Sequence, residues 1–139
     1  MDKKNKMNDL FNLQQDDLVI YDNQLCKVIT MCGSFGVDLT NVHTEVFKDV
    51  DLFDVTPVEL NEVNLKRLGF EYSDLFKRWY LKIFDVHCEY DVEKHHLSIK
   101  SKNKWCSDNS CYYLHDMLHG IKFCDYMACY DFVCEFLNK

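Results

Sequence analysis

The sequence predicts an α+β fold, with all 139 residues in a single domain. Short segments rich in β-branched and aromatic residues, separated by turn residues, indicate antiparallel strands before residue 60 and again after residue 71. Apolar residues at helical spacing near residue 65 and toward the C-terminus indicate helices. We therefore expect a β part (17–60), a connecting helix (61–70), and a short β-meander followed by C-terminal helices (71–139).

The N-terminal β part begins with two apolar segments, Leu18–Tyr21 and Leu25–Met31. Asp22 and Asn23 lie between them and favour a tight hairpin turn. Several further short strands are expected before residue 60. Five or six short strands joined by tight turns suggest a small SH3-like β-barrel or a strongly curled sheet, because closure removes exposed strand edges.

The connecting helix is specified at both of its ends. Asn61 is a good N-cap residue, and the apolar pair Leu60 and Leu65 has the spacing of a hydrophobic staple. Gly69 supplies a left-handed residue that ends the helix, and Phe70 is placed to pack back on it. This segment is a structural joint rather than a chemical site.

The remaining residues predict a meander and two helices. Strands are expected over 78–84, 86–90 and 95–100. Leu114, Met117, Leu118 and Ile121 then mark a helix, with possible caps at Asp108 or Ser110 and a break at Gly120. A second apolar stripe runs over 126–137.

Composition and charge limit the classes of partner that we expect for this protein. The net charge of −7 opposes general attraction to nucleic acid or to an anionic membrane, although a local basic patch stays possible. No apolar run has the length of a membrane span, so no membrane partner is expected. The N-terminal residues form a polar stretch without an apolar signal region. The eight cysteines are therefore read as mostly reduced thiols of a cytoplasmic protein.

Two segments carry a family resemblance. The order strand, Asp-Asn turn, strand precedes the motif Pro57-x-x-Leu60-Asn61-Glu62-x-x-Leu65-x-Arg67-x-Gly69-Phe70. A later segment reads Tyr113-Leu114-His115-Asp116-Met117-Leu118. Together they resemble a group of small proteins encoded by phages and mobile elements of gut Bacteroides-type bacteria, in which a helix reading Tyr-Val-His-x-Leu-Gln closes the fold. Leu118 stands where the group has Gln. The resemblance covers about residues 17–70 and 113–123, and it implies an SH3-like fold and a phage-like context, not a reaction.

One candidate metal site has the residue types of a zinc centre, namely Cys106, Cys111, His115 and His119. If the last three share one helix, Cys111 and His119 lie about 12 Å apart along its axis, too far for one metal ion. The alternative is a structural helix in which His115 packs against the sheet. That alternative is preferred, and no cofactor is expected.

The window 94–105 is a candidate nucleic-acid site. It contains no acidic residue and offers cationic side chains beside an aromatic ring: Lys94, Lys100, Lys102, Lys104 and Trp105. Amines beside a stacking ring are what a single-strand groove uses. The alternative is a solvated lysine-rich turn, with Trp105 returning to the core.

Catalysis finds little support in the sequence. His87 and Cys88 are adjacent, so on a strand they point to opposite faces and do not pair. No nucleophile elbow, phosphate loop or His-Glu-x-x-His motif occurs. We expect a protein that is not an enzyme.

A cluster of aromatic residues around an arginine has the composition of a binding hot spot: Tyr72, Phe76, Arg78, Trp79 and Tyr80. The alternative is an internal core seam of the fold.

From these features we expect a phage-type accessory protein that acts by protein–protein association. Its partner would be in the virion or would be a host factor such as a defence system. A nucleic-acid-binding module built on 94–105 and a small zinc-stabilised module are the alternatives. Partner identity and oligomeric state are left open by the sequence.

Overall fold

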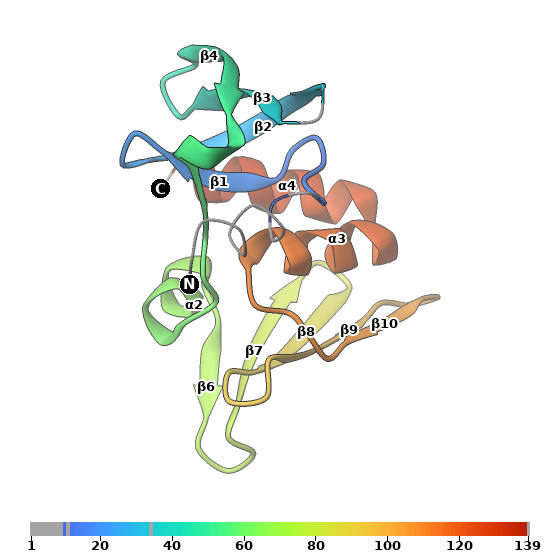
Figure 1. Ribbon diagram of the computed structural model, residues 1–139. Coiled ribbons are helices and arrows are strands. Elements are labelled where there is room, and N and C mark those ends of the chain that lie inside the picture. The colour runs from blue at the N-terminus through green and yellow to red at the C-terminus, as the bar shows by residue number, and fades with distance from the viewer. Residues whose placement is uncertain (1–9, 11, 34, 139) are drawn as a thin grey trace. The chain divides into compact units, whose positions relative to one another are not determined.

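The computed structural model describes residues 10, 12–33 and 35–138 (Figure 1). It contains two antiparallel sheets and the helices α2, α3 and α4, so the class is mixed α+β as predicted. The chain divides into two compact units. One comprises residues up to Val58 together with Val133 onward, and the other comprises Glu59–Phe132.

The sheet of the first unit is formed by five strands. They are β1 (Leu18–Tyr21), β2 (Gln24–Cys32), β3 (Gly36–Asn41), β4 (Val46–Asp51) and β5 (Val55–Pro57), with the 3₁₀ turn η1 (Leu52–Asp54) before the last. The strand order is β4-β3-β2-β1-β5. Asp22 and Asn23 both have positive φ, of 51° and 60°, and make the predicted β1–β2 turn. Within the described residues β4 and β5 are not paired, so this sheet is open and does not close into a barrel.

The first unit has its own apolar core. Alternating residues of β2 and β3 point to one side of the sheet, where Val28, Val37 and Leu39 are fully buried. Leu10 and Leu52 complete the same cluster from outside the sheet. The core is therefore built from residues widely separated along the chain.

The connecting helix α2 (Glu62–Leu68) follows the prediction at both ends. The Asn61 side chain accepts a hydrogen bond from the amide of Asn64 at 2.9 Å. Gly69 has φ 98°, its amide donates to Lys66, and the amide of Phe70 donates to Leu65. This is the Schellman ending that the Gly-Phe pair predicts.

The second unit contains a five-stranded meander. Its strands are β6 (Glu71–Ser73), β7 (Arg78–Ile83), β8 (Val86–Asp91), β9 (His96–Lys100) and β10 (Trp105–Asp108). Neighbours along the chain are neighbours in the sheet, in the order β10-β9-β8-β7-β6. The inner face carries the buried residues Trp79, Ile83, Cys88, Tyr90, Leu97 and Ile99. Helix α3 (Leu114–Cys124) contacts β9 and β10 (Figure 1).

Helix α4 (Tyr126–Leu137) matches the predicted second stripe, with Cys129, Val133 and Phe136 buried. Two details predicted for α3 are wrong. Tyr113 is its N-cap and makes no side-chain capping bond, so neither Asp108 nor Ser110 caps it. The helix also continues through Gly120 to Cys124. In the part of the chain that the structure describes, no helix combines the length and the apolar character needed to cross a membrane.

Candidate functional site

The β6–β7 hairpin exposes two large apolar side chains at its tip. Leu75 is 81% exposed and Phe76 is 62% exposed. The turn itself is well bonded, because the amide of Lys77 donates to the Ser73 carbonyl at 2.7 Å and the amide of Phe76 donates to the Ser73 hydroxyl at 3.3 Å. We call Leu75 and Phe76 on this turn the apolar knob.

The Arg78 side chain stabilises the turn that carries the apolar knob. Its Nη1 donates to the carbonyls of Phe76 at 3.3 Å and Lys77 at 3.1 Å. The same nitrogen lies 3.3 Å from Oδ2 of Asp91, which is buried, and Nε lies 4.0 Å from Glu89. A guanidinium holds several acceptors in a fixed plane, so the turn has a defined shape before any partner binds.

The structure separates the predicted aromatic cluster between the two faces of the hairpin. Trp79 is only 4% exposed, and the half-exposed Tyr72 ring packs on it with centroids 5.1 Å apart. Tyr80 points to the opposite face, where its hydroxyl donates to Glu89 at 3.2 Å. Burial and the Glu89 carboxylate raise the pKa of Tyr80. Of the five predicted interface residues, Tyr72, Phe76 and Tyr80 are accessible, whereas Trp79 belongs to the core and Arg78 supports the turn.

The outer face of the second sheet carries a second candidate surface. The strand register places Lys82 of β7 opposite His87 of β8, His87 opposite Lys100 of β9, and Lys100 opposite Trp105 of β10. Residues paired across strands share one face of a sheet, so these four side chains form a row. All four are exposed, Trp105 by 65%. We call them the basic row.

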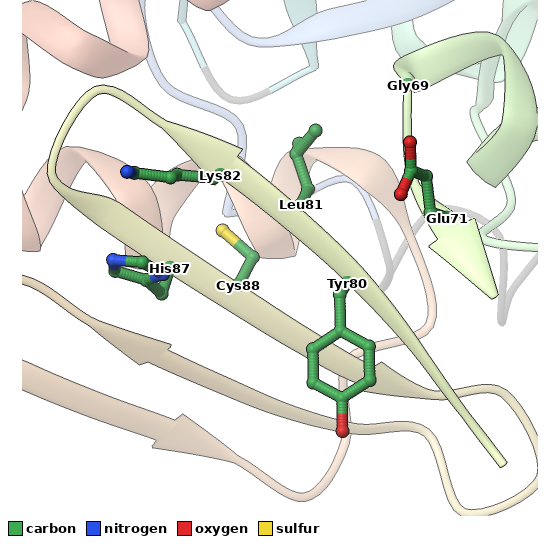
Figure 2. A pocket seen from close by; sticks show the side chains of 7 residues that line it. All are labelled: Gly69, Glu71, Tyr80, Leu81, Lys82, His87 and Cys88. Atoms are coloured by element: carbon green, nitrogen blue, oxygen red, sulfur yellow. The ribbon is translucent and has the colours of Figure 1, made fainter. Parts of the chain in front are cut away.

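Two hollows adjoin the basic row and meet at His87. One, of about 370 Å³, is lined by residues of β7 and β8 together with Gly69 and Glu71. Figure 2 shows Lys82 and His87 pointing the same way from neighbouring strands at this hollow. The other, of about 550 Å³, is lined by Asp85, His87, Lys100, Ser101 and Lys102. Three members of the basic row, Lys82, His87 and Lys100, therefore line a hollow.

The structure divides the predicted nucleic-acid residues into three groups. Lys100, Lys102 and Trp105 lie together at the β9–β10 turn, and Trp105 does not return to the core as its alternative reading required. Lys94 lies in the β8–β9 turn, at the opposite end of β9 from Lys100. Lys104 donates to the Phe123 carbonyl at 3.2 Å and lies 5.2 Å from the centroid of that ring, so it is engaged with α3.

The four candidate metal ligands are not gathered into one ligand set. Among residues 10, 12–33 and 35–138, no group of three or more His, Cys, Asp or Glu side chains is arranged to hold a metal ion. His115 is fully buried, stacked on Tyr113 with centroids 5.7 Å apart, and its ring lies 5.9 Å from that of His119. Burial raises the pKa of the Cys111 thiol, which favours the neutral form over the thiolate that a metal requires.

Sequence reasoning missed Lys82 and His87 as site residues. Both lie outside the lysine-rich window, and only the pairing of β7, β8 and β9 brings them beside Lys100. The two-residue turn after Ile83, with alternation along β7 and β8, was the signal that could have set this register. Comparisons with protein-family models, with curated proteins and with solved structures gave no match for this chain.

Proposed function

We propose that this chain is a non-enzymatic protein that acts by protein–protein association, with the apolar knob as its contact. The observation that supports the proposal is the exposure of Leu75 and Phe76 on a turn held by Arg78. A loop that is free to collapse would bury such side chains against its own strands. Here the backbone hydrogen bond of the turn and the contacts of the Arg78 guanidinium hold the turn in a shape that leaves Leu75 and Phe76 exposed to solvent.

The energetics favour a protein socket as the occupant. Transferring an exposed Leu or Phe side chain into an apolar recess contributes about 1.5–3 kcal/mol each. A preorganised turn loses little conformational freedom on binding, so more of this free energy appears as affinity. The neighbouring Tyr72 supplies an adjacent aromatic surface that is already packed on Trp79. Anchors of this kind are typical centres of protein interfaces.

The biological setting is part of the same proposal. We place the protein among phage-type accessory proteins with an SH3-like N-terminal part, acting in the host cytoplasm on a host factor such as a defence system, or in the virion. The support is the sequence resemblance over 17–70 and 113–123. Fold alone does not determine function, so the contact residues carry the test.

A photo-crosslinking experiment tests the contact directly. Phe76 is replaced by p-benzoylphenylalanine in the full chain, which is expressed in cells that carry its gene and irradiated. We expect one dominant protein adduct, which disappears when Leu75→Ser is added. The matched control carries the same probe at Phe84, which is 66% exposed on the neighbouring β7–β8 turn. No adduct from position 76, or the same adduct from position 84, would contradict the proposal.

A further inference from the structure

The basic row joins positive charge and an exposed aromatic ring on one sheet face. Neighbouring strands are about 4.8 Å apart, so the row from Lys82 to Trp105 spans about 14 Å across four strands. That is about the length of four stacked nucleotides at 3.4 Å each. Lys102 extends the positive charge beside Lys100 along the rim of the larger hollow.

The lysines of this surface are available for an anionic ligand. Within the described part of the chain, Lys82, Lys100 and Lys102 take part in no ion pair. Asp85 is the carboxylate that lines the same hollow, against two lysines and His87. A local excess of positive charge therefore persists on a chain whose net charge is −7.

Trp105 distinguishes this surface from a simple charged patch. Trp105 starts an edge strand and is 65% exposed, so most of its surface is in water, and it lies opposite Lys100, whose amine can hold a phosphate. Stacking on a base is the interaction that suits an exposed ring beside amines. An acidic peptide would use the lysines and leave the ring without a role.

The next row of the sheet limits the length of the site. On the same face, Tyr80 of β7 is paired with Glu71 of β6 on one side and with Glu89 of β8 on the other. This row of residues lies next to the Lys82–His87 pair, two residues away along each strand. Those carboxylates repel phosphates laid along the strands. Double-stranded nucleic acid needs a broad basic face, whereas single-stranded nucleic acid can bind along the basic row alone.

We propose that the outer face of the second sheet binds single-stranded nucleic acid along the basic row. Lys82, Lys100 and Lys102 contact phosphates, and Trp105 stacks on a base. This site is independent of the apolar knob, which lies on the β6–β7 turn. A variant that loses nucleic-acid binding can therefore still be tested for protein binding, and a variant that loses protein binding can still be tested for nucleic-acid binding.

Fluorescence anisotropy of a labelled twelve-nucleotide oligo-dT or oligo-U tests the proposal with the full chain. We expect Trp105→Ala to weaken binding about 5- to 150-fold, and Trp105→Phe to weaken it less. Lys100→Gln with Lys102→Gln should reduce the slope of log K against log salt by about 1.4, since each phosphate contact contributes about 0.7. The matched control removes the same charge elsewhere, as Lys66→Gln with Lys94→Gln, both exposed and both outside the basic row and the apolar knob.

Tryptophan fluorescence gives a second readout, because Trp79 is buried and Trp105 is exposed. The oligonucleotide should quench the exposed tryptophan and leave the buried one unchanged. Equal thermal melting of the variants shows that they are folded. Absence of binding at low salt, equal loss in the control variant, preference for duplex, or equal competition by polyglutamate would each overturn the proposal.

Discussion

At the residue scale, Asp38 shows how a single carboxylate organises the irregular part of the first sheet. Its Oδ1 accepts from the amide of Asp49 at 2.7 Å and from the thiol of Cys32 at 3.2 Å, and Oδ2 lies 3.6 Å from Nζ of Lys48. Asp38 lies between Val37 and Leu39, where the register of β3 with β4 shifts and Asp49 has no partner in the ladder. The carboxylate therefore satisfies polar groups that the bulged ladder leaves over.

These contacts predict a pH dependence of stability. The Asp49 amide and then the Cys32 thiol lower the pKa of Asp38, because both donate to the ionised form. A folded pKa below the unfolded one gives stability that is complete above the unfolded value, about 3.9, and is lost as pH falls through the folded value. Asp38→Asn should lower stability at neutral pH and flatten its decline in acid, as measured by urea unfolding from pH 7 to pH 2.5.

The control for that measurement is Asp131→Asn, an exposed change of the same charge on α4. It should leave the acid dependence of the wild type intact. The prediction is wrong if Asp38→Asn and Asp131→Asn give parallel curves.

At the element scale, Gly120 is a position where α3 packs closely on the second sheet. A Cβ at this position would lie 2.7 Å from Cδ1 of Ile99 and 3.5 Å from Sγ of Cys106. The glycine is therefore needed for contact between helix and strand, and not for ending the helix. This is why a sequence-based break at Gly120 was wrong.

A double-mutant cycle tests this packing. Gly120→Ala gains about 1 kcal/mol of helix propensity but overpacks the contact with Ile99, which costs about 1–3 kcal/mol. We expect net destabilisation in the wild type by up to about 2 kcal/mol. In the Ile99→Val background, which lacks Cδ1, the same change should be neutral or stabilising. Chemical denaturation of the four proteins measures the coupling, and strictly additive free energies would contradict the contact.

Local signals explain which elements were predictable. Helix α2 and the Asp22–Asn23 turn are encoded by caps and turn residues within a few positions, and the structure confirms both. Strands β6 and β10 are short and were missed, because pairing with β7 and β9 creates them. In the candidate site, composition identified Lys100 and Trp105, whereas Lys82 required the register of three strands.

At the scale of the whole molecule, the eight cysteines are all free and serve as reporters of folding. Cys26, Cys88, Cys111, Cys124 and Cys129 are buried, whereas Cys32, Cys106 and Cys134 are partly exposed. Burial raises the pKa of Cys26 to about 11 and that of Cys88 to about 12. At pH 8 a thiol with a pKa near 11 is about 0.1% thiolate, so it reacts slowly even when reagent reaches it.

Thiol titration with an aromatic disulfide reagent at pH 8 should therefore show two classes. At most the three partly exposed cysteines react with the native protein, and the five buried ones appear with the unfolding transition in urea. Peptide mapping of the labelled sites assigns each class. Rapid reaction of all eight thiols without denaturant would mean that the two cores are not closed.

The first unit is built from two separate segments of the chain, and this has a consequence for biosynthesis. Its strands precede Val58, but its remaining residues begin at Val133, after the whole of the second unit. During translation, strands β1–β5 are synthesised first, and residues 59–132 are translated next. The first unit is completed only when the residues from Val133 onward have also been synthesised. A nascent chain stalled before Val133 would carry an N-terminal sheet without its last helical turns, and this is the stage at which chaperones and proteases would have their best access to it.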